Sequence, residues 1–195
     1  MGDYFQTIVD VDATAEDAAR LGAKVVAWLV AEGIVEAEPS NCVLDGDGRG
    51  HAAGPRYGTA VHDDTYENGG LYVHVGRTMF DSGQGHPEAV TCPHCSARTE
   101  LTLADQPWEP DDEAWEPFRG AIRGWDEGDA EATKVGCRSC GRAAPVDRWR
   151  WKDDFFAFGH LGFTFWNWTN LRDAFVAEFS PRLGGHRTVE LGGKL

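Results

Sequence analysis

The sequence predicts an α+β fold, in which a two-layer domain with a mostly antiparallel sheet and two main helices carries a four-cysteine module. The chain opens with a strand and a helix and closes with a helix and a strand, an order that suits one sheet bringing the termini together. Two C-x-x-C pairs, with an acidic segment between them, interrupt this pattern. We therefore expect residues 1–90 and 143–195 to form one α+β domain, and residues 91–142 to form a module with an acidic helical insert at 96–136.

The first strand and the first helix follow from alternation and capping. Residues 4–11, YFQTIVDV, alternate between two faces and predict a strand. The hydroxyl of Thr14 can accept a hydrogen bond from the amide of Asp17, so a helix is expected to start there. Gly33 can take the positive φ that ends a helix, with Ile34 making the accompanying apolar contact. The apolar face of this helix consists of Ala18, Leu21, Val25 and Leu29.

Further strands and one more helix are predicted for the outer segments. Residues 71–80 alternate and predict either a strand pair or one bent strand, and residues 186–191 predict the closing strand. A final helix is expected to be capped by Thr169 or Asn170, and Pro181 is expected to break or kink its last turn. The apolar residues of this helix recur every four positions, at Leu171, Phe175, Phe179 and Leu183.

Composition and charge disfavour several classes of protein. With 42% hydrophobic residues, the chain of 195 residues can bury a core. Its net charge of −14 repels nucleic acid and anionic lipid at long range. The longest uninterrupted apolar run, residues 25–31, is far shorter than the roughly 18 residues that cross a bilayer. Because no basic region followed by an apolar stretch marks a secretion signal, we expect a cytoplasmic protein.

A glycine-rich loop at residues 45–58 resembles a calcium loop without completing it. The start DGDGRG places Asp45, Asp47 and Gly50 as a calcium loop requires, but Arg56 stands where a bidentate Glu is needed. No G-x-x-x-x-G-K-[ST] motif follows a strand anywhere in the chain. Neither calcium binding nor ATP hydrolysis is therefore expected.

Four of the five cysteines form two C-x-x-C pairs, at Cys92, Cys95, Cys137 and Cys140. In each pair a tight turn can point both sulfurs at one ion, and two such turns complete a tetrahedron. A redox pair needs an exposed thiol of low pKa at a helix N-terminus, and the presence of two pairs disfavours that alternative. Four thiolates leave no position for water or substrate, so we predict one structural zinc ion. Cys42 is expected to be a small buried apolar residue.

The two cysteine turns, C-P-x-C and C-x-x-C-G, resemble those of the zinc-ribbon class, in which two such turns hold structural zinc. The resemblance covers residues 91–98 and 135–142. Gly141 can take the positive φ with which the second turn reverses. The spacing of 41 residues between Cys95 and Cys137 exceeds that of compact ribbons, so a simple three-stranded ribbon is not expected.

The segment between the cysteine turns is strongly acidic. Residues 100–131 contain eleven acidic residues and two arginines. An amphipathic helix is predicted here, and Pro117 is acceptable only if the helix begins near it. Its apolar side chains are Phe118, Ile122 and Trp125. The acidic flank is either a solvated face or a docking surface for a basic partner, with the candidate residues Asp111, Asp112 and Glu113.

From residue 134 to residue 152 the charge reverses, with six basic residues against Asp147 alone. Part of this charge can offset a zinc–tetrathiolate centre. Alternation in DRWRWK sends Trp149 and Trp151 to one face of a strand and the basic side chains to the other. The same strand therefore cannot easily offer both to one nucleic acid, and nucleic-acid binding is not favoured.

Four histidines are the titratable candidates for acid–base chemistry, and one of them lies in an aromatic segment. His160 is the best of them, because flanking glycines allow close backbone approach and the surrounding aromatic residues can line a cleft. Trp166 and Trp168 are expected to be partly exposed and to border such a cleft. In the structural alternative, these aromatic residues belong to the core and the histidine is a packing residue. The remaining titratable candidates are His62, His74 and His86.

Three stretches resemble a group of small uncharacterised actinobacterial proteins, some of them labelled as ATPases of sugar transporters. These are residues 3–10, DYFQTIVD, residues 157–168, AFGHLGFTFWNW, and the closing residues 193–195, GKL. The resemblance implies a bacterial origin and no established activity. The missing phosphate loop contradicts the ATPase label.

We expect a cytoplasmic, zinc-stabilised binding or adaptor protein that acts on a protein with a basic surface, through its acidic insert or its aromatic face. One alternative is a small enzyme that does not depend on zinc and uses a cleft around His160 with a nearby carboxylate. A third is a nucleic-acid binder that uses the basic second cysteine turn. No membrane interaction is expected.

Overall fold

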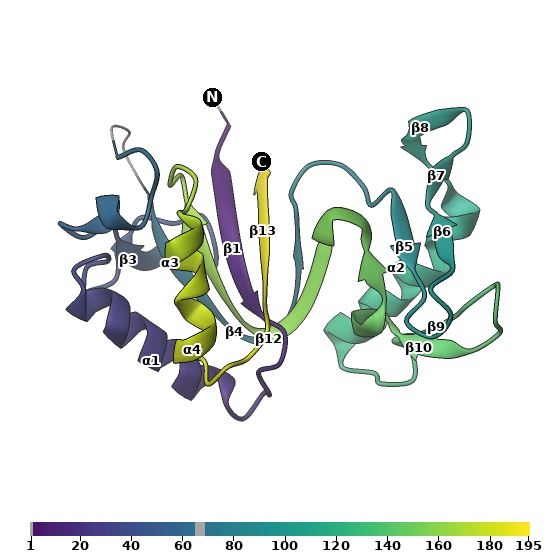
Figure 1. Ribbon diagram of the computed structural model, residues 1–195, viewed down its shortest axis with the longest axis horizontal. Helices are drawn as coiled ribbons and strands as arrows, with labels where there is room; N and C mark the ends of the chain where they lie inside the picture. The colour runs from purple at the N-terminus through teal and green to yellow at the C-terminus, as the bar shows by residue number, and fades with distance from the viewer. Residues whose placement is uncertain (1, 65–68) are drawn as a thin grey trace.

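The structure, a computed structural model, describes residues 2–64 and 69–195 and contains two lobes (Figure 1). The first lobe holds both termini, and the second holds the four cysteines. The strands, α-helices and 3-10 helices (η) are β1 (Tyr4–Asp10), α1 (Ala18–Ala31), β2 (Ser40–Asn41), β3 (Arg49–Ala52), η1 (Tyr57–Thr59), β4 (Gly70–Asp81), β5 (Ala89–Thr91), β6 (Arg98–Glu100), β7 (Thr102–Leu103), β8 (Gln106–Pro110), α2 (Asp112–Glu127), β9 (Lys134–Gly136), β10 (Ala143–Pro145), η2 (Val146–Arg148), β11 (Arg150–Trp151), η3 (Lys152–Asp154), β12 (Phe156–Trp166), α3 (Asp173–Ala177), α4 (Phe179–Arg182) and β13 (Thr188–Lys194).

One antiparallel sheet organises the first lobe. Within the described residues its strand order is β13-β1-β12-β4-β3-β2, and all neighbouring strands run antiparallel. Because β1 and β13 are adjacent, the two ends of the chain meet, and the amide of Leu195 donates to the carbonyl of Asp3 at 2.9 Å. The predicted α+β class with a mostly antiparallel sheet is confirmed, and so is the pairing of the outer strands.

Helices α1, α3 and α4 cover one face of this sheet, on the left in Figure 1. The hydroxyl of Thr14 accepts from the amide of Asp17 at 3.2 Å, as predicted, but α1 itself begins one turn later, at Ala18. Gly33 has a φ of 68° and ends the helix as expected. No helix in the described part of the chain is long and apolar enough to cross a membrane. The core between helices and sheet includes Leu21, Val25, Leu29, Leu161, Phe163, Phe165 and Phe179.

The predicted final helix is divided into α3 and α4. Pro181 has no N–H to donate to the carbonyl of Ala177, four residues earlier, and α3 ends at that residue. The prediction that Thr169 or Asn170 caps the helix is wrong, because the cap position is Arg172. The preceding residues stay extended, since the amide of His62 donates to the carbonyl of Asn170 at 2.9 Å. All four predicted apolar residues of this region are buried.

Strand β4 is one bent strand rather than a strand pair. Its register with β12 shifts between Gly159 and Leu161, where Gly76 on β4 has a φ of 122°. This bulge bends the strand and re-aims the side chains that follow it. On the face of the sheet that the helices do not cover, Gly162 leaves room for the ring of Phe80.

The second lobe has a hydrophobic core of its own. Helix α2 contributes Phe118, Ala121 and Ile122 to this core. The buried cysteines Cys92 and Cys137 also belong to it. Trp149 and Trp151 are buried in the core, while Arg148 and Arg150 are exposed, so rings and charges are separated as predicted. The prediction of one strand over DRWRWK is wrong, because only Arg150–Trp151 form a strand, between the 3-10 helices η2 and η3. The boundaries at residues 91 and 142 stay a prediction.

Helix α2 begins at Asp112, so the expectation of a start near Pro117 is wrong. The carboxylate of Asp111 accepts from the amides of Glu113 and Ala114, at 3.0 and 3.1 Å, and caps the helix. Pro117 removes the hydrogen bond that the carbonyl of Glu113 would accept inside the helix. The guanidinium of Arg138 donates to that carbonyl instead, at 3.2 Å, which allows the proline inside the helix.

Candidate metal centre

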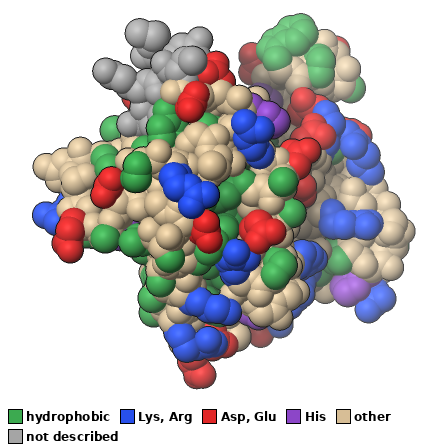
Figure 2. Space-filling view, turned by 60° about the vertical axis from the view of Figure 1, so that its left-hand side comes forward, with side chains coloured by type: hydrophobic (Ala, Val, Ile, Leu, Met, Phe, Trp, Pro, Cys, Tyr) green, Lys and Arg blue, Asp and Glu red, His purple; other side chains and the backbone are tan. Residues whose placement is uncertain are grey.

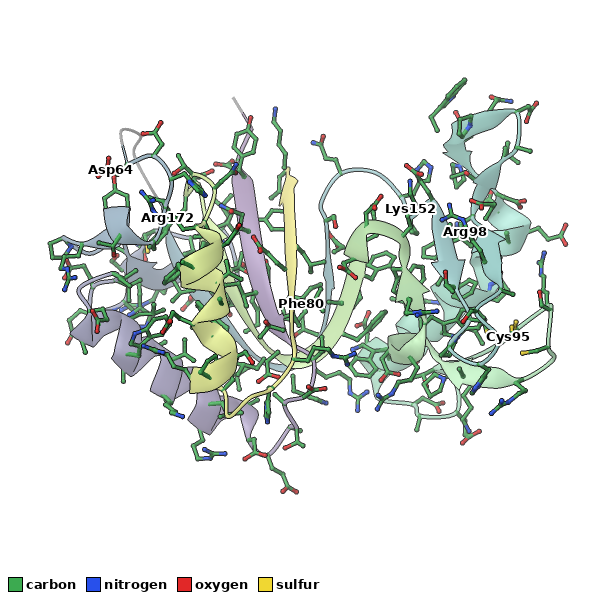
Figure 3. The ribbon with its side chains drawn as sticks, viewed as in Figure 1. Asp64, Phe80, Cys95, Arg98, Lys152 and Arg172 are labelled. Carbon is green, nitrogen blue, oxygen red and sulfur yellow. The ribbon has the colours of Figure 1, made fainter. Side chains whose placement is uncertain are left out.

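The four predicted cysteines meet at one point of the second lobe, and they can hold a metal ion. The sulfurs of Cys92, Cys95, Cys137 and Cys140 all lie within 4.8 Å of one another. The sulfurs of Cys95 and Cys137 are 3.7 Å apart. A tetrahedral ion with bonds of about 2.3 Å to sulfur separates its ligands by about 3.8 Å, so the observed spacing fits such an ion. Figure 3 shows the sulfur of Cys95 at the outer edge of the lobe.

The first cysteine turn follows β5 and is closed by backbone hydrogen bonds. The amide of Cys92 donates to the carbonyl of Ala97 at 2.9 Å, and the amide of Ser96 donates to the carbonyl of Cys92 at 3.0 Å. The amide of His94 points at the sulfur of Cys92, 3.4 Å away. Such amide donors stabilise a thiolate, so the turn is built for a charged sulfur.

The second cysteine turn repeats this geometry between β9 and β10. The amide of Cys137 donates to the carbonyl of Arg142 at 2.9 Å, and the amide of Gly141 donates to the carbonyl of Cys137 at 2.8 Å. Gly141 has a φ of 72°, as predicted, and Ser96 takes the same left-handed conformation in the first turn with a φ of 58°. The ring of His94 interacts with the carbonyl of Ala143 at 3.1 Å, so this residue links the two turns.

The four thiols affect one another's protonation. The amide of Cys140, followed by that of Ser139, lowers the pKa of Cys137 to about 6. The amide of Ala97 acts in the same direction on Cys95, but burial and the three neighbouring thiols raise the pKa of Cys95 to about 12. Deprotonation of a second thiol is therefore disfavoured beside the first thiolate, and a divalent cation bound between the sulfurs would remove that electrostatic penalty.

Nothing in the described residues pairs His160 with a carboxylate, and its catalytic role stays a prediction. Among the described residues, no hydrogen bond or ion pair joins it to a carboxylate, and its Nδ1 is buried without a partner. Burial, followed by the charge of Arg77, lowers the pKa of His160. The ring lies 6.0 Å from that of Trp125, where β12 meets α2. This histidine therefore sits at the junction of the two lobes.

The expectation that Trp166 and Trp168 are partly exposed is wrong, because their exposed fractions are 5% and 3%. The indole of Trp166 donates to Asp45 at 2.7 Å, beneath the glycine-rich loop that folds over it. Asn167 has a φ of 57°, which reverses the alternation and turns Trp168 onto Phe165, with ring centres 5.0 Å apart. Both tryptophans are core residues.

Two histidine–carboxylate pairs lie outside the residues that sequence reasoning emphasised. His74 is 3.4 Å from Asp45 and 2.9 Å from the hydroxyl of Thr164, on the face of the sheet that the helices leave open. His186 contacts the buried Asp10 at 2.9 Å. For the first pair, His74 was among the titratable candidates and Asp45 belongs to the broken calcium motif, but nothing in the sequence joined the two residues. The second pair had no sequence signal.

The three acidic residues predicted to bind a partner already have partners inside the lobe. Asp111 caps α2, Asp112 pairs with Arg119 at 3.1 Å, and Glu113 lies 3.7 Å from Arg138. Their negative charges thus stabilise the N-terminal turn of α2.

Comparison of the chain with family models, curated proteins and solved structures gave no match. The resemblance to zinc ribbons rests on the four cysteines and on the closeness of their sulfurs. The resemblance to the actinobacterial group stays a prediction.

Proposed function

We propose that the four cysteines bind one zinc ion whose role is structural. The observation that carries this proposal is the closeness of the four sulfurs, which come from two turns far apart in the chain. Zinc favours four thiolates in a tetrahedron, and a filled shell leaves no position for substrate. Such sites bind zinc with on the order of 10 to 16 kcal/mol, comparable with the stability of a whole domain. The ion would thereby hold the second lobe together.

We further propose that the zinc-stabilised lobe is a binding or adaptor module for a protein with a basic surface. Residues 99–118 contain seven acidic residues and no lysine, arginine or histidine. Asp111, Asp112 and Glu113 have internal partners, whereas Asp105 and Glu109 of the β7–β8 hairpin have no cap or ion-pair partner among the described residues. Both are exposed. The core positions of Trp166 and Trp168 argue against an aromatic binding face around them.

The charge distribution favours a basic partner over nucleic acid. On the face shown in Figure 2, lysine and arginine side chains are intermixed with aspartate and glutamate. Arg148 lies 3.5 Å from Asp147, and Arg138 contacts Glu113. A polyanion would have to displace these carboxylates while approaching a chain of net charge −14. A four-thiolate zinc site needs reduced cysteines, and this requirement supports a cytoplasmic location in the proposal.

The experiment is a titration of zinc-loaded protein with a short fluorescent peptide that alternates arginine with glycine, followed by anisotropy. We expect binding that weakens with salt, that a glutamate–glycine peptide does not reproduce, and that a zinc chelator abolishes. The double variant Asp105→Asn/Glu109→Gln should bind the peptide more weakly. Glu36→Gln/Glu38→Gln, on the first lobe, is the matched control. Equal binding by both variants, or no binding at low salt, would contradict the proposed partner.

A further inference from the structure

The β7–β8 hairpin displays a tryptophan that the fold does not use. Its two strands pair only with each other in the described sheets, and Figure 1 shows the hairpin extending from the second lobe. Trp108 on β8 is 68% exposed and Leu103 on β7 is 37% exposed. Tryptophan is the side chain that most often anchors a protein interface, and its apolar area favours burial. An exposed indole on an extended hairpin is therefore available to a partner.

A groove of about 400 Å³ lies beside this indole. Three separate segments line it: residues 84–88 between β4 and β5, the hairpin residues Pro107 and Trp108, and residues 152–155 around η3. Phe155 supplies a second aromatic wall and packs edge-on against Phe156, with ring centres 4.8 Å apart. The groove is thus bordered by aromatic rings, at a place where three segments distant in the sequence contribute walls.

The chemistry of the groove already accommodates one basic side chain. The ammonium of Lys152 contacts the carboxylate of Glu88 and lies 3.5 Å from Asp153 (Figure 3 labels Lys152). Those two carboxylates neutralise Lys152, and Asp105 and Glu109 add two more negative charges on the hairpin. An incoming cation therefore meets a negative field next to Trp108.

Arginine is the cation that this arrangement fits best. A planar guanidinium stacks on an indole and keeps its edge free for carboxylates, whereas an ammonium is a strongly hydrated point charge. The described residues make this contact at two places: the guanidinium of Arg77 lies 4.5 Å from the ring centre of Trp125, and that of Arg182 lies 3.9 Å from the ring centre of Trp28. Trp108 has no such internal arginine among the described residues.

We propose that Trp108 and the adjoining groove bind an arginine side chain of the partner's basic segment, with the guanidinium on the indole and the carboxylates at its edge. This inference rests on the proposed function, because it names the contact through which the acidic lobe recognises its partner. It makes the recognition selective for arginine over lysine, which net charge alone cannot do.

The test compares an arginine–glycine peptide with a lysine–glycine peptide of equal length on wild-type protein, Trp108→Ala and Tyr4→Ala. Tyr4 is 53% exposed on the first lobe and serves as the matched aromatic control. We expect wild-type protein to prefer the arginine peptide at least tenfold, and Trp108→Ala to lose at least tenfold in affinity for it. Tyr4→Ala should bind as wild type does. Metal content and circular dichroism would establish that each variant is folded.

The outcomes separate this inference from the function on which it rests. If the hairpin carboxylate variant loses binding while Trp108→Ala retains it, or if both peptides bind equally, the arginine site is wrong and the acidic docking surface stands. If neither peptide binds wild-type protein, both proposals fail. Sedimentation velocity addresses a second copy as the occupant: a wild-type dimer that becomes a monomer in Trp108→Ala would also overturn the arginine site.

Discussion

Arg138 connects the second cysteine turn to the first turn of α2. Its guanidinium donates at 3.2 Å to the carbonyl of Glu113, the group that loses its helical donor because Pro117 has no N–H. The same guanidinium lies 3.7 Å from the carboxylate of Glu113, but this pair is 61% and 91% exposed. The carbonyl contact therefore matters more than the ion pair.

The structure sets the size of the effect. Arg138→Ala removes one hydrogen bond worth about 1 kcal/mol. The exposed ion pair adds at most about 0.5 kcal/mol. In a Pro117→Ala background the amide of residue 117 can donate to the carbonyl of Glu113, so the same substitution should cost less than about 0.5 kcal/mol. The two positions should consequently be coupled by about 0.5 to 1 kcal/mol.

The assay is urea unfolding of the four proteins of this cycle at a fixed free zinc concentration, followed by circular dichroism. Arg142→Ala, which removes the other exposed arginine next to the second turn, is the control and should change the unfolding free energy little. If Arg138→Ala destabilises the protein equally with and without Pro117, the guanidinium does not replace the missing helical donor and the reasoning is refuted.

Two further predictions concern packing and pH. Gly162→Ala would place a Cβ 2.4 Å from the ring of Phe80 and should lower the free energy of unfolding in urea by about 1 to 3 kcal/mol. Gly120→Ala meets no atom within 4 Å and should stabilise α2 by up to about 1 kcal/mol. Equal effects of the two substitutions would contradict the close packing of Phe80 on Gly162. Burial and Arg77 lower the pKa of His160 from 6.5, so the unfolded chain binds more protons near that pH, and unfolding free energy should fall as pH drops below about 6.5. His160→Gln should reduce this dependence, and an unchanged pH slope would refute the assignment.

Local signals in the sequence sufficed for the outer strands and for the cysteine turns. Alternation over residues 4–11 and a glycine at position 33 specify a strand and a helix end without reference to distant residues. The long spacing between Cys95 and Cys137 did not prevent the sulfurs from meeting, because a hairpin and a helix fill the interval and return the chain to its starting point. The metal site could be predicted because the preference of four thiolates for one ion does not depend on the length of the loop between the two turns.

What could not be predicted depended on contacts between distant segments. The start of α2 was misplaced because the donor that compensates for Pro117 comes from Arg138, which lies 25 residues after Glu113 in the sequence. Trp166 was expected to be partly exposed because the sheet pattern does not show that the loop carrying Asp45 folds over it. The exposed Trp108 carried no signal, since an isolated tryptophan in an acidic segment reads equally well as a core residue.

X-ray absorption at the zinc edge, on protein purified under reducing conditions without added metal, identifies both the metal and its ligands. One zinc per chain is expected, surrounded by four sulfur atoms at about 2.3 Å. Protein that is folded and free of metal, or a zinc shell containing nitrogen or oxygen, would contradict the proposed zinc site.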